Sequence, residues 1–268
     1  MLDATFIHAP TIGATTEQRL WQAGILSWSD YLRAAPSDLP LTAAQREILA
    51  PAVEHAAEAL ANDDDRYFAR LLPMREHWRA VPHFMERIGF LDIETNGGYQ
   101  PEDVTLIGVY DGYESRFFIK GRNLEDFSQE AERVRLWITF FGTGFDLPFL
   151  RRRFPKLPLD HLHVDLCPSL RKLGFKGGLK RVETQLGIHR RPEVDGMDGM
   201  DAVRLWSQYR RHNDEDALNL LITYNREDIE NLSLLLAFTY PRLKAASGFP
   251  VGVTSLAGVD SASDSISS

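Results

Sequence analysis

The sequence predicts a mixed α/β fold that is preceded by a small helical region. The first 85 residues or so show helix signals and no strand pattern, apolar strand-like runs begin at Ile88, and helical periodicity returns from Gly178 onward. A hairpin followed by alternating helices and strands is typical of a mixed sheet flanked by helices. We therefore expect a helical accessory region over 1–85, an α/β domain over 86–244 and a disordered Ser/Gly/Ala-rich tail over 245–268.

Capping signals and a turn residue predict the first helices. Thr15–Gln18 and Thr42–Gln45 have the spacing of a capping box, and Gly24 indicates where the first helix ends. The segment from Pro10 to Ile25 also resembles a degenerate helix-hairpin-helix element, a module that grips backbone phosphates through turn amides. Because it has one Gly in its first turn and little basic charge, a grip on nucleic acid and a purely structural helical cap are two open alternatives.

Apolar runs bounded by turn residues predict the first strands. Ile88–Ile93 and Val104–Tyr110 are apolar, and Asp111-Gly112 separates the second run from Tyr113–Lys120, which is a strong hairpin signal. We expect three antiparallel strands in this part of the chain.

The second half of the chain alternates helices and strands. We expect a helix near Leu124–Arg135, a buried strand over Leu136–Phe141 that ends at Gly142–Gly144, and a short strand over His161–Asp165. The longest helix is expected from near Asp214 to about Thr239, where apolar residues recur at helical spacing.

Charge and composition exclude several classes of protein. The chain has 30 Lys and Arg against 38 Asp and Glu, a formal charge of −8, so it is not a generally basic nucleic-acid coat. The single cysteine, Cys167, cannot form an internal disulfide or a multi-cysteine zinc site. With no basic, apolar leader and no run approaching the ~18 apolar residues of a membrane span, we expect a cytoplasmic protein that is neither exported nor embedded in a membrane.

Asp92 and Glu94 form an acidic pair within an apolar predicted strand. Side chains two apart on a strand share a face, so these carboxylates lie side by side while Leu91 and Ile93 point the other way. Their repulsion is unfavourable unless a cation offsets it, and hard oxygen ligands suit Mg²⁺ or Mn²⁺. Taken alone, the pair also fits a strand end whose acids face water.

Two further acids and a tyrosine complete the candidate site. Asp146 follows a predicted strand and a Gly-containing turn, where it is also suited to capping a helix. Tyr224 and Asp228 lie one turn apart on the predicted long helix. Together with Asp92 and Glu94 they supply the ligands and the water-positioning hydroxyl for two-metal phosphodiester hydrolysis.

These residues resemble the motifs of the DEDD superfamily of ribonuclease H-like 3'-to-5' exonucleases, in the variant with Tyr in the third motif, and most of all the YprB-like ribonuclease H-like group. The resemblance covers about 87–240. Leu91–Thr95 resembles the first exonuclease motif, Phe145-Asp146 the second, and Tyr224-x-x-x-Asp228 the third. Gly178–Ile188 is similar to a helix that these proteins carry before the third motif.

The resemblance implies a ribonuclease H-like fold and a two-metal exonuclease acting on DNA or RNA 3' ends. Asp92, Glu94, Asp146 and Asp228 would hold two Mg²⁺ or Mn²⁺ ions, and Tyr224 would orient or help to deprotonate the attacking water. Two alternatives stay open: a catalytically weak nucleic-acid-binding module, and a structure-specific endonuclease on the same fold.

One departure from the family pattern concerns substrate placement. Relatives often carry Asn-Gly ahead of the second motif, whereas this chain has Phe141-Gly142, so a substrate-contacting amide is missing. We expect Thr95, Phe145, Lys176 and Lys180 to contact the substrate. The two lysines flank a Gly pair at a predicted helix start, where backbone amides are able to approach a phosphate, although the segment also fits a plain turn.

Basic residues gather between the second and third motifs. Residues 151–191 hold eleven basic residues against three acidic ones, a local balance of 11 − 3 = +8. This cluster is either a phosphate-binding rim or a solvated basic face. Its basic members are Arg151, Arg152, Arg153, Lys156, Arg171, Lys172, Lys176, Lys180, Arg181, Arg190 and Arg191.

Three further polar residues lie on the short strand that ends at Asp165. Asp165 is placed to cap the next helix, or to act in the outer shell of a metal site. His161 and His163 share a strand face, but with no third soft ligand nearby we do not expect a transition-metal site there.

Overall fold

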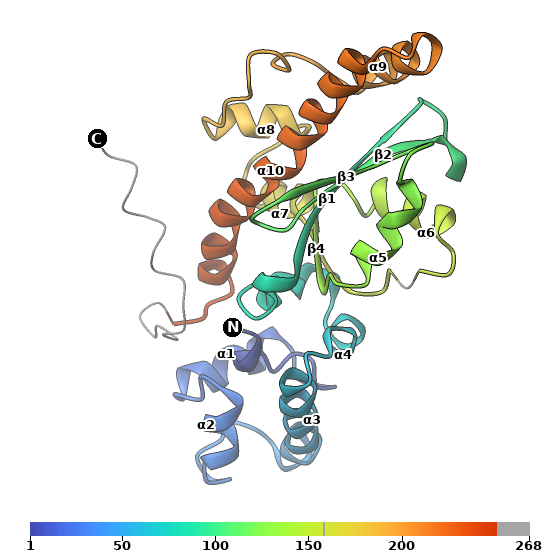
Figure 1. Cartoon of the computed structure of the whole chain (residues 1–268). Helices are drawn as coiled ribbons and strands as arrows, with labels where there is room; N and C mark the ends of the chain where they lie inside the picture. The colour runs from blue at the N-terminus through green and yellow to red at the C-terminus, as the bar shows by residue number, and fades with distance from the viewer. Residues whose placement is uncertain (158, 251–268) are drawn as a thin grey trace.

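A computed structural model describes residues 1–157 and 159–250. The chain begins with a helical region that lies below the sheet in the view of Figure 1. Its helices are α1 (Ala14–Gln22), α2 (Trp28–Arg33), α3 (Ala43–Ala61) and α4 (Asp65–Leu71), followed by the 3₁₀ helices η2 (Met74–Ala80) and η3 (Met85–Arg87).

The two expected capping boxes have different outcomes. Thr42 and Gln45 form a complete capping box at the start of α3, as predicted. The box expected at Thr15 is wrong, because α1 begins at Ala14. The carbonyl of Gly13 already accepts hydrogen bonds from the backbone N–H groups of residues 16 and 17, which leaves Thr15 inside the first turn.

A five-stranded mixed sheet forms the centre of the molecule (Figure 1). The strand order is β3-β2-β1-β4-β5, with β1–β2 and β2–β3 antiparallel and β1–β4 and β4–β5 parallel. The expected antiparallel trio at the hairpin is confirmed. The strands are β1 (Ile88–Thr95), β2 (Val104–Tyr110), β3 (Ser115–Ile119), β4 (Leu136–Thr139) and β5 (Leu162–Asp165).

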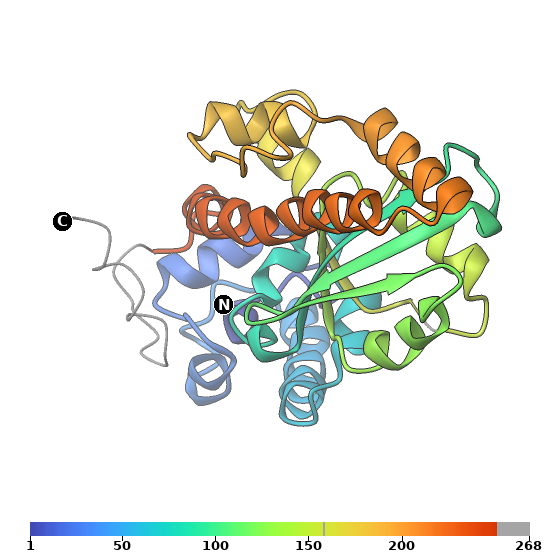
Figure 2. The ribbon, with the colours of Figure 1, turned by 45° about the horizontal axis from the view of Figure 1, so that its top comes forward.

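Helices cover both faces of the sheet (Figure 2). On one face, α5 (Phe127–Ala131) and α6 (Asp146–Arg153) pack against the apolar residues Leu91 and Ile93 of β1. The long helix α10 (Glu215–Ala246) crosses the other face. The remaining helices are α7 (Leu166–Lys172), α8 (Leu179–Gln185) and α9 (Gly199–His212).

Two elements are shorter than the sequence predicts. The strand expected to reach Phe141 ends at Thr139, because Phe141 has φ +67° and left-handed backbone cannot continue a strand. The helix expected over 124–135 shortens to α5 with a preceding 3₁₀ turn over Leu124–Asp126.

The accessory helices and the sheet share one apolar core. Buried side chains of α1, such as Trp21, belong to the same cluster as Ile138 of β4 and Leu236 of α10. The core extends into the expected tail, since α10 continues to Ala246 and Phe249 packs edge-on against Trp21 with ring centroids 5.2 Å apart. That part of the disorder prediction is wrong, and the rest of the tail, residues 251–268, lies outside the described residues.

Among the helices of the described segments, none is both long and apolar enough to cross a membrane.

Candidate active site

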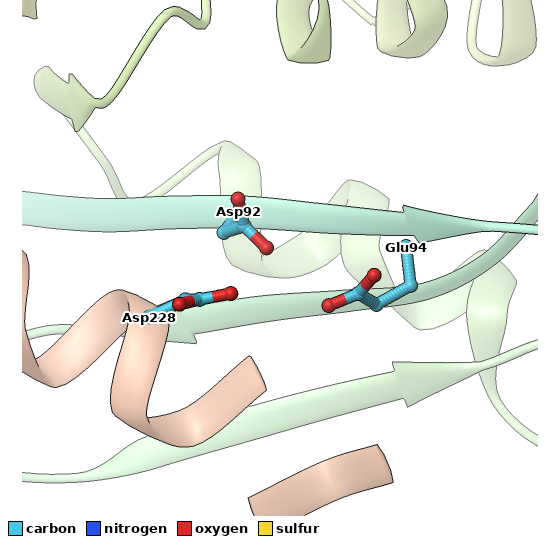
Figure 3. A group of neighbouring side chains, drawn as sticks. All are labelled: Asp92, Glu94 and Asp228. Carbon is cyan, nitrogen blue, oxygen red and sulfur yellow. The ribbon is translucent and has the colours of Figure 1, made fainter. Parts of the chain in front are cut away.

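One strand and one helix bring three carboxylates together. Asp92 and Glu94 extend from the same face of β1, and Asp228 extends toward them from the middle of α10 (Figure 3). One oxygen atom from each lies within 4.8 Å of the others, which is close enough to ligate a common ion. The pleat of β1 therefore places the acids toward α10 while Leu91 and Ile93 enter the core on the opposite face.

Asp146 lies beside this cluster without joining it. It is the first residue of α6 and is buried, and its Oδ1 accepts a hydrogen bond of 3.0 Å from the backbone N–H of Ile93, the residue between Asp92 and Glu94. The structure thus brings three of the four predicted acids into one cluster and ties the fourth to the strand that carries two of them.

Tyr224 and Lys180 form a second contact at the same site. The Tyr224 side chain is buried one turn before Asp228, and its hydroxyl accepts a hydrogen bond from the Lys180 Nζ atom. That Nζ atom lies 4.3 Å from the centroid of the tyrosine ring, so Lys180 also places a positive charge over the ring face.

A cleft of about 240 Å³ opens between β1 and α10 at these residues. Of the four residues expected to contact the substrate, Thr95 and Phe145 line it, whereas Lys176 and Lys180 are not among its lining residues. The full lining is Asp92, Ile93, Glu94, Thr95, Phe145, Gly199, Val203, Tyr224 and Asp228.

Burial and mutual repulsion make the ionised carboxylates unfavourable in this cleft. Burial, with the neighbouring carboxylates adding to it, raises the pKa of Glu94 to about 8 and the pKa of Asp146 to about 7. The pKa of Asp92 lies well above its usual range for the same reasons. A hard divalent cation would offset this cost, so the donor set fits Mg²⁺ or Mn²⁺.

Sequence reasoning missed the role of Asn225. Its Nδ2 group donates to Asp92 Oδ2 at 2.8 Å and to Glu94 Oε1 at 3.4 Å, so it bridges the two acids of β1. The close approach depends on Gly108, which pairs with Asp92 across the sheet, because a Cβ atom there would lie 1.9 Å from Asn225 Oδ1. The sequence did contain a signal for this role. Asn225 is a polar residue three positions before Asp228, so it lies on the same buried side of α10.

Arg190 is the second residue whose role the sequence did not reveal. Its guanidinium donates to both carboxylate oxygens of Glu183 at 2.7 Å and to Asp228 Oδ1. Asn231 Nδ2 donates to Glu183 at 3.0 Å, which holds that carboxylate in place. All of these side chains are buried, so Arg190 is a counter-ion of Asp228.

A family model described as the RNase_H superfamily matches residues 89–240. The chain belongs to this superfamily. The matched residues include β1, α6 and α10 up to Tyr240, and therefore all the acids of the candidate site.

A solved structure has the same fold as this RNase_H superfamily member. The family B DNA polymerase from the hyperthermophilic archaeon Pyrobaculum calidifontis superposes with a TM-score of 0.50 at 20% identity. The match covers 60% of this chain and 25% of the polymerase, so the chain spans about a quarter of the length of that protein. Among curated proteins, none matches the chain. The expected ribonuclease H-like mixed sheet with a helical N-terminal region is confirmed.

In this RNase_H superfamily protein the basic residues of segment 151–191 do not all lie on one surface. Arg153 pairs with Glu125 beside α6, on the face of the sheet opposite α10, and Arg191 pairs with Glu227. Together with the buried Arg190, these residues show that the segment is not one continuous phosphate-binding rim. A count of local charge does not reveal these three pairings, which packing creates; for the segment as a whole the sequence leaves a phosphate-binding rim and a solvated basic face as alternatives.

Asp165 has a structural role. Its side chain caps α7 by accepting from the backbone N–H of Cys167, which confirms the capping interpretation. It also accepts from the backbone N–H groups of Phe141 at 2.8 Å and Thr143 at 3.1 Å, and so braces the loop that leads to Asp146. His161 and His163 each bond within the protein, to Asp65 and to Thr139.

Proposed function

We propose that the chain is a metal-dependent 3'-to-5' exonuclease that hydrolyses phosphodiester bonds of DNA or RNA. The observation that supports this most strongly is the cluster of Asp92, Glu94 and Asp228 with Tyr224 one helical turn away. Membership of the RNase_H superfamily supports nuclease chemistry in general. The finer assignment, to the DEDD group with Tyr in the third motif and its YprB-like members, follows from the motif resemblance.

The carboxylates are the proposed metal ligands. Asp92, Glu94 and Asp228 would hold one Mg²⁺ or Mn²⁺ ion. Asp146 would supply the further carboxylate that a second ion needs. Bound divalent ions supply charge for the phosphate oxygens and lower the pKa of a bound water. Asn225 and Arg190 hold three of these carboxylates in fixed orientations before any ion binds.

Tyr224 is assigned to the orientation of the attacking water. Burial first, and then the charges of Asp228 and Glu94, raise the pKa of the Tyr224 hydroxyl far above its usual value, so the phenol keeps its proton at neutral pH. Because its oxygen accepts from Lys180, its own proton is left to hold a water molecule in the cleft.

The preference for an exonuclease over an endonuclease rests on the resemblance of the three motifs to those of 3'-to-5' exonucleases. The cleft that the acids line, of about 240 Å³, has room for the scissile phosphate that either enzyme would bind there. The complete set of acids favours an enzyme over a catalytically weak binding module.

The proposal is tested with purified full-length protein and end-labelled single-stranded and duplex DNA and RNA. In Mg²⁺ or Mn²⁺ a 5'-labelled strand should shorten in single-nucleotide steps, and EDTA should stop the reaction. An Asp92→Ala, Asp228→Ala double variant, purified in parallel, should be inactive but folded. Wild-type cleavage by this variant would show that the assigned site is not the active site.

Tyr224→Phe tests the chemical role separately. The variant keeps the ring and Asp228, so KM should change little. Loss of a positioned water typically costs about 10²–10⁴-fold, and this loss should appear in kcat. A phenylalanine variant with full turnover would remove Tyr224 from the proposed mechanism.

A further inference from the structure

A second and larger cavity, of about 630 Å³, lies where the accessory region meets the ends of β5 and α10. We call it the junction groove. Its walls come from η2, from the loop between β4 and α6, from α7 and from the last turn of α10, with Ala14 and Gln18 of α1 closing one side. None of the proposed metal ligands lines it.

The junction groove carries cations that the protein leaves uncompensated. Arg171 and Lys172 are exposed, and in the described part of the chain neither forms an ion pair. Arg75 is also exposed, and its only carboxylate neighbour among the described residues is Glu76, 3.8 Å away. Glu76 itself is committed to the buried Arg79 at 2.9 Å. The groove is therefore suited to an anionic ligand.

An aromatic ring stands at the edge of the same groove. Phe141 is 56% exposed, unusual for a phenylalanine, and sits in the strained left-handed region at φ +67°. The ring packs over Gly144, where an added Cβ would lie 2.7 Å from it, and Asp165 holds the surrounding backbone. The protein thus holds a largely solvent-facing ring in one place, although nothing in its own core requires the ring there.

The groove and the acidic cleft lie on two sides of one short loop. Phe141, Thr143 and Gly144 line the groove, while Phe145 lines the cleft. Along α10 the cleft includes Asp228 and the groove includes Leu243, which at 1.5 Å per helical residue are roughly 22 Å apart. A ligand that occupies both sites is therefore extended and longer than one nucleotide.

We propose that the junction groove binds the single-stranded part of the substrate strand upstream of the 3' end that enters the acidic cleft. A base stacks on Phe141, and backbone phosphates lie against Arg171 and Lys172. Aromatic platforms beside uncompensated cations are the features that bind single strands without sequence preference. A duplex fits less well, because its bases are stacked on one another and do not offer a face to Phe141. This inference deepens the proposed function and rests on it.

The test compares two groove variants with a matched control. Arg171→Ala/Lys172→Ala removes two exposed charges from the groove, and Phe141→Ala removes the ring while keeping a Cβ atom. Arg133→Ala/Lys156→Ala removes two exposed charges from near α5 and α6, away from the groove. Thermal melts establish that all variants are folded. Binding of a fluorescent 12-nucleotide single strand is measured in EDTA across a salt titration, and cleavage of a dinucleotide and of the 12-mer is measured in Mn²⁺.

The two groove variants should weaken 12-mer binding in different ways. The charge variant should bind about tenfold more weakly, with a shallower salt dependence. Phe141→Ala should bind roughly 5- to 150-fold more weakly, as for the loss of a base–aromatic stack. Both should cleave the dinucleotide at the wild-type rate, and the control should match wild type in every assay.

The groove assignment is overturned if the groove variants bind the 12-mer as tightly as the control, or if wild type binds a blunt duplex as tightly as the single strand. It is equally overturned if the groove variants lose dinucleotide cleavage to the same extent as 12-mer cleavage. If no variant cleaves any substrate but the groove variants still lose 12-mer binding, the proposed hydrolysis fails and the groove assignment stands.

Discussion

Arg190 links Asp228 of the acidic cleft to Glu183 of α8. Its guanidinium donates to one oxygen of Asp228 and to both oxygens of Glu183, and all three side chains are buried. Asn231 fixes Glu183 from the next turn of α10. The contact makes a proposed metal ligand part of a preformed ion network, so its orientation does not depend on the ion.

Removing Arg190 alone should be more damaging than removing the pair. Arg190→Met leaves Glu183 and Asp228 as uncompensated buried charges and should lower the free energy of unfolding by about 3–5 kcal/mol. Arg190→Met/Glu183→Met removes one of those charges and should recover much of this loss. Urea denaturation of the two single variants and the double variant measures the coupling. Strictly additive losses would contradict the network.

The same double variant should remain impaired in hydrolysis. Without Arg190, Asp228 loses the contact that orients it, and loss of such supporting contacts typically lowers activity or metal affinity about 10–100-fold. Initial rates at several Mn²⁺ concentrations measure this effect. A stable double variant with wild-type rates would limit Arg190 to a structural role.

Gly108→Ala and Asn225→Ala should have similar effects on activity. A methyl group at residue 108 would lie 1.9 Å from Asn225 Oδ1 and displace the amide that bridges Asp92 and Glu94. We expect each variant to need about 10–100-fold more metal for half-maximal rate. Gly13→Ala, just before α1, is the control for a glycine substitution with no neighbour within 4 Å and an ordinary backbone, φ −99°. A Gly108→Ala variant with the metal dependence of wild type would contradict this account.

Stability without metal should fall as the pH rises from about 6.5 to about 8, above the range in which the buried His8, His77 and His163, with their lowered pKa values, have the opposite effect. Over this range Glu94, with its pKa raised to about 8, and Asp146, with its pKa raised to about 7, keep protons that the unfolded chain has released. The native state therefore binds more protons than the unfolded state, and the free energy of unfolding decreases with pH. Bound Mg²⁺ favours the ionised carboxylates, so its stabilising effect should grow over the same range.

Thermal melts in EDTA and in MgCl₂ at pH 6, 7 and 8 measure this linkage. The rise in Tm on adding Mg²⁺ should be largest at pH 8. Asp92→Asn/Asp228→Asn, which removes two of the interacting charges, should show a flatter pH dependence in EDTA and a smaller rise with Mg²⁺. An equal rise at all three pH values in wild type would exclude the acids as the source.

Phe141→Asn should stabilise the protein. The backbone at residue 141 has φ +67°, and left-handed backbone costs most residues roughly 1–2 kcal/mol, whereas Asn tolerates it. With the Phe141 ring already 56% exposed, little apolar burial is lost. We expect Tm to rise by about 2–4 °C. Phe141→Ala keeps the strained backbone, so its Tm should not rise above that of wild type. An Asn variant that melts below the Ala variant would show that backbone strain at residue 141 does not limit stability.

The sequence alone determined the features that depend on local periodicity. Alternation on a strand placed Asp92 and Glu94 on one face, and the helical repeat placed Tyr224 one turn from Asp228, as the structure confirms. The capping box at Thr42 and the hairpin at Asp111-Gly112 are local in the same sense. These features follow from backbone geometry within a few residues, so a single sequence is enough to predict them.

Only the tertiary structure decided which polar groups meet. Arg190 and Asp228 are 38 residues apart and Asn225 and Asp92 are 133 apart, and no local pattern relates them. The packing of α8 against α10 and of α10 against β1 creates these contacts, and it turns Arg190 from a surface cation into a buried counter-ion. A buried charge is tolerated only with a partner, and the partner is chosen by the fold in three dimensions, which periodicity does not encode.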